Sequence, residues 1–259
     1  MTDGLVLIGR EAGVTTLTLN ATERRNALSI PLRDALLAGL EGAMADPQCR
    51  AVVVTGNGGH FCSGGDISGM GSANAINARS RFESAHKVVS LMVEGGKPVI
   101  AAVEGYAVGA GLSLAIAADI VVAAKTAKFS CSFNRIGLVP DLGLAYTLPM
   151  RAGMGRARHI MLTGDMFDAE TAERWGLVEQ IAEPGQALAD ATALARRLAE
   201  TTAPLSQLYT KRLLSRMPGS LADILKAEAD SQGTLYTSRD HAEGREAFLG
   251  KRKPSFEGR

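Results

Sequence analysis

Two apolar segments that each run into a glycine-rich turn constrain this chain most. The first, AVVVT at 51–55, leads into GNGGHFCSGGD at 56–66, and the second, VIAAVEGYAV at 99–108, leads into GAG at 109–111. Short apolar runs rich in β-branched residues are typical of buried strands, and glycine permits backbone conformations that other residues rarely adopt. Small residues continue the second segment to 118, so a strand, a tight turn and a helix are expected there. We therefore predict an α/β fold with two stacked units of similar structure.

The turn at Gly109-Ala110-Gly111 also indicates a function. The first N–H groups of a helix have no partner inside the helix, and the helix dipole places partial positive charge at that end. Such a turn can hold an oxygen atom that carries, or is about to carry, negative charge. An oxyanion site is therefore the first functional hypothesis, and a purely structural tight turn is the alternative.

The rest of the chain predicts mixed structure with a helical end. Ser29, Pro31 and a helical repeat of apolar positions predict a helix that ends at Asp46-Pro47. Other expected elements are strands at 14–19, 119–124 and near 177–181, a helix around 82–92, a mobile loop at 67–78 and four helical segments beyond 187. The composition becomes almost wholly helical near residue 200, which predicts an α/β core at 1–200 and a helical region at 201–259.

Composition argues against several classes of function. With 28 basic and 27 acidic residues the net charge is +1, so no strong field attracts nucleic acid or an anionic membrane. The longest uncharged apolar segment, between Glu104 and Asp119, is shorter than the ~20 residues that span a bilayer, and the N-terminus lacks the pattern of a signal peptide. Three cysteines without CxxC spacing and four scattered histidines predict a reduced, cytoplasmic protein without a metal site.

Four motifs in order make the chain resemble the crotonase (enoyl-CoA hydratase/isomerase) superfamily over essentially its whole length. They are NAL at 26–28, FCSGGDIS at 61–68, KPVIAAVEGYAVGAG at 97–111 and AFLGKRKPSF at 247–256. The resemblance implies a spiral core of ββα turns and a C-terminal helical region that builds a homotrimer or a dimer of trimers. It also implies a coenzyme A thioester as substrate, without a permanently bound cofactor.

The resemblance assigns roles to particular residues. The backbone N–H groups of Gly65 and Ala110 would form an oxyanion hole, which stabilises the enolate made when a proton is removed next to a thioester. Asp66 is a candidate ligand contact, and anchoring its loop or capping the next segment is its alternative role. Relatives also contact coenzyme A at positions that correspond here to Arg24, Ala27, Ser63, Ile67 and Lys251. A solvated surface charge is the alternative for Arg24 and Lys251.

The chain departs from the hydratases where their two catalytic glutamates lie. Ser113 and Phe133 occupy those positions, and neither can hold and deprotonate water, so ordinary hydration is not expected and Phe133 is placed among the substrate-binding residues. Asp141, in GLVPDLG, matches the acid of several isomerases of the superfamily, and its segment is most similar to the epoxyphenylacetyl-CoA isomerase-like members. Burial beside Phe133, Ile136 and Leu138 is expected to raise its pKa, and a simple turn residue after Pro140 is the alternative.

The preferred interpretation is an isomerase that moves a double bond, or opens a strained ring, in an acyl-CoA, with Asp141 as the acid/base. Alternatives are a hydratase, an enzyme that uses Asp141 as a nucleophile as acyl-CoA dehalogenases do, and a non-catalytic CoA-binding homologue. Dinucleotide binding is disfavoured because neither glycine loop has GxGxxG spacing. Leu-Gly-Leu-Ala at 142–145 replaces the Gly-Gly of the phenylacetate relatives, so the acyl group itself is not predicted.

Overall fold

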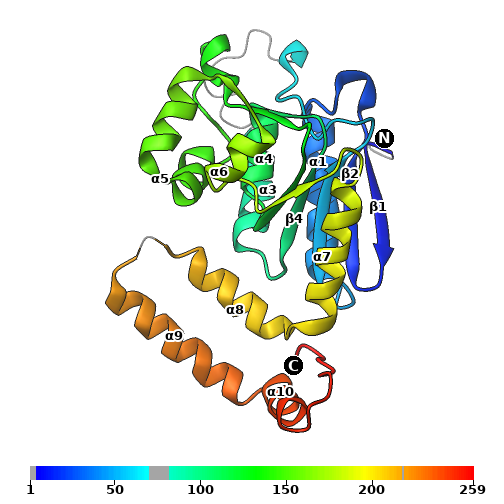
Figure 1. Cartoon of the computed structure of the whole chain (residues 1–259), viewed down its shortest axis with the longest axis vertical. Helices are drawn as coiled ribbons and strands as arrows, with labels where there is room; N and C mark the ends of the chain where they lie inside the picture. Colours follow the sequence, from blue (N-terminus) through cyan, green and yellow to red (C-terminus); the bar gives the residue numbers. More distant parts are fainter. Residues whose placement is uncertain (1–3, 70–81, 218) are drawn as a thin grey trace.

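The computed structural model describes residues 4–69, 82–217 and 219–259. Its main sheet has six strands in the order β1-β2-β3-β4-β6-β9, and only the β1–β2 pair in it is antiparallel. The strands are β1 (Val6–Glu11), β2 (Val14–Leu19), β3 (Ala51–Gly56), β4 (Val99–Val103), β6 (Ile120–Ala124) and β9 (Gln180–Ala182). The parallel strands β2, β3, β4 and β6 all end at one edge of the sheet, which lies uppermost in Figure 1.

A second, smaller sheet carries the turn that opens α4. It is formed by β5 (Tyr106–Val108), β7 (Lys128–Ser130) and β8 (Met166–Asp168) in that order. The sequence led us to expect a single strand from Val99 to the glycine turn, but Glu104 and Gly105 separate β4 from β5 and move the chain from one sheet to the other. The helix α4 (Ala110–Ile116) then begins directly after Gly109, as predicted.

Helices cover both faces of the main sheet (Figure 1). On one face lie α1 (Ile30–Ala45) and α3 (Glu83–Glu94), and on the other lies α7 (Ala187–Thr201), which contributes three buried alanines. The predicted start of α1 is confirmed, because the Ser29 hydroxyl accepts a hydrogen bond from Leu32 N at 3.3 Å and Pro31 lies in the first turn. The repeat of α1 is also confirmed by its fully buried leucines, each stabilising the fold by ~2–3 kcal/mol: Leu32, Leu36 and Leu40.

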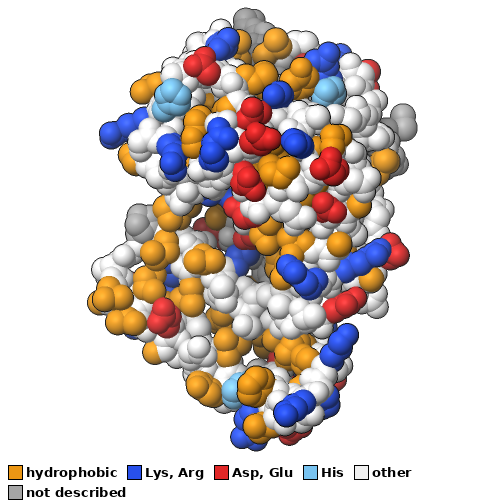
Figure 2. Space-filling model, viewed as in Figure 1, with side chains coloured by type: hydrophobic (Ala, Val, Ile, Leu, Met, Phe, Trp, Pro, Cys, Tyr) orange, Lys and Arg blue, Asp and Glu red, His pale blue; other side chains and the backbone are white. Residues whose placement is uncertain are grey.

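The C-terminal helices extend away from the sheets as an arm. After η3 (Ser132–Ile136), α5 (Leu144–Thr163), α6 (Ala169–Arg174) and α7, the chain forms α8 (Pro204–Leu214), α9 (Leu221–Tyr236) and α10 (Arg239–Leu249), so the predicted helical end is confirmed. The pair Lys211–Asp119, at 2.6 Å, fastens α8 to the start of β6. Hydrophobic side chains gather on the surface of the arm (Figure 2), among them Leu221, Leu225 and Tyr236 of α9.

Two further observations concern the predicted mobile loop and the length and polarity of the helices. Residues 70–78 of the predicted mobile loop lie outside the described residues, and Ile67–Gly69 forms a short 3₁₀ helix, η2. In the described part of the chain, no helix is both long enough and apolar enough to cross a membrane.

Candidate active site

The two glycine-rich turns predicted from the sequence lie against each other. Cys62 N donates to Tyr106 O at 2.8 Å and Val108 N donates to Cys62 O at 3.0 Å, so the first glycine loop runs alongside β5. Gly111 then lies directly on the backbone of Cys62, where a side chain would collide with the Cys62 carbonyl. Gly109, with φ 54°, faces the Cα of Gly64. Glycine is required here because the two backbones approach closely.

Each turn presents one unused backbone donor. Leu28 N donates to Gly64 O at 2.7 Å and Asp66 N donates to Leu28 O, so the N–H of Gly65, between them, points away from Leu28. Ala110 is the first residue of α4, where an N–H has no partner inside the helix. Within the described residues neither the Gly65 nor the Ala110 N–H has a hydrogen-bond partner. Two such donors on touching turns suit an oxygen that gains negative charge.

Asp141 is a buried carboxyl group on a separate loop. It lies on the loop between η3 and α5, and in the described structure its buried Oδ1 has no hydrogen-bond partner. Burial raises the pKa of Asp141 from its ordinary 3.8 to about 6, against the opposing effects of the positive charges of Arg33 and His86. The expected direction is confirmed, although Phe133 is buried whereas Ile136 and Leu138 are about half exposed.

Electrostatic effects relate Asp141 to residues that adjoin the two turns. Its charge acts on Cys131, the residue after Ser130, whose carbonyl accepts the Gly109 N–H at 2.8 Å. It also acts on Arg33, in the first turn of the helix that follows Leu28. The carboxyl of Asp141 therefore interacts electrostatically with one residue that follows the partner of Gly109 and with one in the helix that follows Leu28.

Ser113 and Phe133 add no acid or base to this site. Ser113 is fully buried in α4, and its hydroxyl donates to Gly109 O at 3.4 Å. Phe133 is 6% exposed and lies in η3. The first residue supports the turn and the second supplies apolar surface, so neither brings a proton-transfer group to the site.

Arg24, Ser63 and Asp66 come together at the rim of the site. The Asp66 carboxylate accepts hydrogen bonds from Ser68 N and Oγ at 3.0 and 2.6 Å and from Arg24 Nη1 at 2.9 Å. The Ser68 hydrogen bond, with the Arg24 charge, lowers the pKa of Asp66. The Ser63 hydroxyl donates to Arg24 O at 3.0 Å. Asp66 therefore has the anchoring and capping role considered as its alternative, and a ligand contact stays a prediction.

The other predicted coenzyme A contacts differ in position. Ala27 and the exposed Ile67 flank the Arg24–Asp66 pair. Lys251 follows α10, which lies at the other end of the molecule from α4 (Figure 1). The C-terminal tail binds there too, since Arg50, just before β3, donates to Glu257 O at 3.2 Å. A single chain therefore does not bring Lys251 to Arg24, because α10 extends away from the strand ends that carry the site.

Asn26 is a residue whose structural role the sequence reasoning missed. It is fully buried with φ 56°, and its side chain accepts from Ala21 N at 2.9 Å and donates to Asn57 O at 2.9 Å and His60 O at 2.7 Å. It thereby fastens the turn before α1 to the first glycine loop. The signal was present in NAL at 26–28, because an asparagine tolerates a left-handed backbone.

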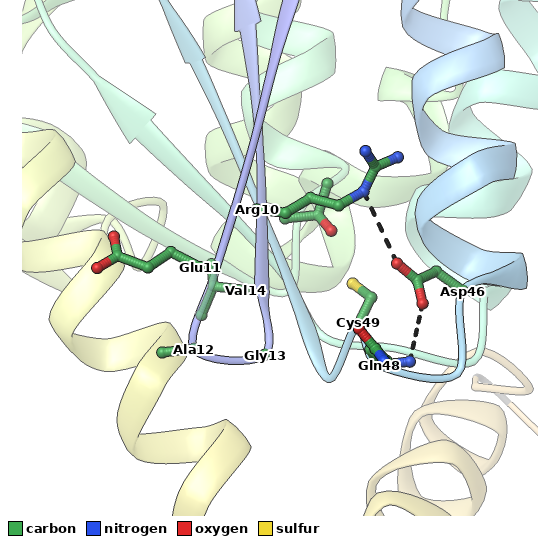
Figure 3. A pocket seen from close by; sticks show the side chains of 9 residues that line it. Arg10, Glu11, Ala12, Gly13, Val14, Asp46, Gln48 and Cys49 are labelled. Carbon is green, nitrogen blue, oxygen red and sulfur yellow. Dashed lines mark hydrogen bonds and ion pairs between the residues drawn. The ribbon is translucent and has the colours of Figure 1, made fainter.

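A separate pocket of about 140 Å³ lies at the β1–β2 turn (Figure 3). Arg10 and Asp46 form an ion pair of 3.7 Å across it. The pocket is near the amino ends of β2 and β3, whereas the glycine turns follow the carboxyl ends, so it belongs to no part of the site. Within the described residues, no group of three His, Cys, Asp or Glu side chains could hold a metal ion.

The core is a largely parallel α/β sheet, and two touching glycine turns present N–H donors that have no partner in the described structure. These features define an enzyme of the crotonase fold. The chain belongs to the enoyl-CoA hydratase/isomerase family, whose model matches residues 9–259. It is 37% identical over 254 residues to the 1,2-epoxyphenylacetyl-CoA isomerase of Escherichia coli K12, covering 96% of this chain and 97% of that one. It is 39% identical to a probable enoyl-CoA hydratase of Rhodobacter capsulatus, covering 95% of each. An enoyl-CoA hydratase crystal structure from Polaromonas sp. JS666 superposes with a TM-score of 0.91 at 35% identity, covering 97% of this chain and 99% of that one.

Proposed function

We propose that this enzyme isomerises a double bond or a strained ring in the acyl group of a coenzyme A thioester. The observation that carries the proposal is the single carboxyl of Asp141, buried and with an unpartnered oxygen, where Ser113 and Phe133 supply none. One carboxyl is sufficient for isomerisation, because it can take a proton from one carbon of the acyl chain and return it to another. Hydration needs a second group that holds and activates water.

In this proposal Asp141 transfers the proton and the two backbone N–H donors stabilise the enolate. Asp141 removes a proton and the thioester carbonyl becomes an enolate, whose oxygen is held by the N–H groups of Gly65 and Ala110. The same carboxyl, now protonated, returns the proton at the new position. A pKa of about 6 suits this exchange near neutral pH, because both protonation states are then accessible. Proton transfer of this kind requires no permanently bound cofactor.

The proposal extends to binding and assembly. Arg24 and the neighbouring Ala27, Ser63, Asp66 and Ile67 would receive the coenzyme A portion. Lys251 would reach that portion only from another copy, so we also propose a homotrimer or a dimer of trimers in the cytoplasm. Exposed apolar side chains outside the site supply surface for such contacts, including Met154, Leu162, Leu221 and Phe248.

Hydration is the second candidate, and the names of the relatives favour it. The Rhodobacter capsulatus and Polaromonas proteins are named as hydratases, and they resemble this chain as much as the isomerase does. A hydratase here would have to hold its water with groups other than Ser113 and Phe133.

Product mass separates the two candidates. A panel of enoyl-, dienoyl- and ring-bearing coenzyme A thioesters is offered in deuterated water, and products are analysed by mass spectrometry. Isomerisation keeps the mass apart from exchanged protons, whereas hydration adds one water. Asp141→Asn should abolish exchange at the acyl carbons and leave coenzyme A binding intact, and the exposed Asp165→Asn serves as control. Exchange at the original rate in Asp141→Asn, or hydrated products alone, would overturn the isomerase proposal.

A further inference from the structure

The turn that carries Asp141 has a backbone conformation that its sequence does not favour. Leu144 N donates to Asp141 O at 3.1 Å, and the two residues between them have positive φ, 51° for Leu142 and 69° for Gly143. This is the pattern of a type I′ turn, in which glycine and asparagine predominate. A leucine in the left-handed region is strained, because its Cβ lies too close to the backbone. Some other interaction must hold Leu142 there.

Packing of the Leu142 side chain supplies that interaction. Leu142 is 3% exposed and belongs to the main hydrophobic core, as does the fully buried Leu144. Gly143, between them, lies so close to α3 that a Cβ would be 3.1 Å from Cγ1 of Val89. The turn is therefore pressed against the core from both sides, and burial of the leucine outweighs the strain in its backbone.

The Oδ1 atom of Asp141 has no comparable attachment of its own. Its buried Oδ1 lacks a hydrogen-bond partner in the described structure, and a carboxylate oxygen in that state is better solvated outside the protein. No polar contact of that oxygen accounts for its buried position. The backbone on either side must keep it in place, and the anchored residue next to it is Leu142.

We propose that Leu142 is the positioning residue of the acid/base: its buried side chain locks the left-handed turn that keeps the Asp141 carboxyl inside the site. The inference rests on the proposed function, in which Asp141 transfers the proton. Leu142 touches no reacting atom in this scheme. It acts through the orientation of its neighbour, as a supporting residue does for a catalytic group.

The charged and titratable groups that act on Asp141 come from other elements. Arg33 belongs to α1 and His86 to α3, and both favour the ionised carboxylate. Cys131 precedes η3, and burial, together with the Asp141 charge, raises the pKa of its thiol to about 11, so it is neutral at physiological pH. A change at Leu142 leaves all three in the chain, and its effect reports on the position of the carboxyl.

The test replaces Leu142 by glycine, which fits the positive φ but removes the anchor. The control is Leu148→Ala, which removes buried volume in α5, six residues beyond Leu142, and leaves the residues of the turn unchanged. The apparent pKa of Asp141 is measured by NMR titration of Asp-labelled enzyme, with the resonance assigned from Asp141→Asn, and pH profiles of kcat/KM and KM are recorded in parallel. In Leu142→Gly we expect the pKa to fall from about 6 by about one unit or more toward 3.8. We expect kcat to fall at least roughly tenfold with little change in KM. Leu142→Met should restore both, and Leu148→Ala should lose thermal stability alone.

The NMR readout keeps this inference separate from the proposed function. If Asp141 is not the acid/base, Asp141→Asn retains activity, yet the titration still reports whether Leu142 keeps the carboxyl buried. A pKa that stays at about 6 in Leu142→Gly, with kcat equal to that of Leu148→Ala, overturns the positioning role whatever Asp141 does.

Discussion

Replacing Asp141 by asparagine should make the fold more stable at alkaline pH. The carboxyl is buried without a partner for Oδ1, and its pKa is raised from 3.8 to about 6 by that burial. The unfolded chain exposes the same carboxyl to water, where it ionises near its ordinary value. Above pH 6 the folded enzyme therefore holds a charge that water would solvate better, and asparagine removes that charge with little change in shape.

The size of the effect follows from the two pKa values. A difference of one pH unit corresponds to about 1.4 kcal/mol, so the ionised carboxyl destabilises the fold by about 2–3 kcal/mol at pH 8. Below pH 3.8 the group is neutral in both states and contributes nothing. The stability of the wild type relative to Asp141→Asn is thus highest at acid pH and is lost as the pH rises through about 6.

Urea unfolding of both proteins between pH 4.5 and 8.5, at one protein concentration, measures this difference. The asparagine amide also changes the free energy of unfolding by an amount that does not depend on pH. The prediction therefore concerns how the difference in free energy of unfolding between the two proteins changes with pH. Asp165→Asn, at a side chain that is 69% exposed, is the control for the same chemical change at the surface. A difference between wild type and Asp141→Asn that is constant across the range would refute the reasoning, because the carboxyl would then titrate alike in both states.

Two further predictions concern the donors and the assembly. Ala110→Pro removes the N–H at the first position of α4, where proline is compatible with a helix. It should lower kcat about a hundredfold to a thousandfold and leave coenzyme A affinity within a few fold of the original. Unchanged kcat would exclude this N–H from catalysis. Light scattering coupled to gel filtration should give three or six times the 27.1 kDa of one chain, and a monomer at micromolar concentration would contradict the proposed assembly.

Long, repetitive elements were predictable because local patterns specify them. The Ser29 cap and the leucine repeat fixed α1, and the β-branched run at 51–55 fixed β3. In contrast β1 was missed, because Leu7 and Ile8 are about half exposed and the strand shows no buried face. The three-residue strands of the small sheet are too short to have a period, and only their long-range partners define them.

The candidate site was likewise predictable where local motifs specify it and not predictable where tertiary contacts decide the structure. The motifs at 61–68 and 97–111 predicted two turns, and the structure brings them together through backbone contacts. Sequence could not place Lys251, because the direction of the arm depends on tertiary contacts such as Lys211–Asp119. Nor could it indicate that Leu142 adopts a positive φ, since a leucine does so only where packing compensates for the strain.

The contact between Gly111 and the Cys62 backbone limits how this enzyme can diversify. The two turns meet main chain against main chain, and a side chain at Gly111 would collide with the Cys62 carbonyl and push them apart. Gly111 therefore cannot be replaced without moving the two turns, because even alanine there would collide with the Cys62 backbone. Under the proposed function, new specificities are expected to arise instead from the loop between η3 and α5, where the side chains of Leu138 and Val139 are exposed. An engineer seeking altered specificity should vary the exposed Leu138 and Val139 of that loop and leave Asp141, Leu142 and both glycine turns untouched.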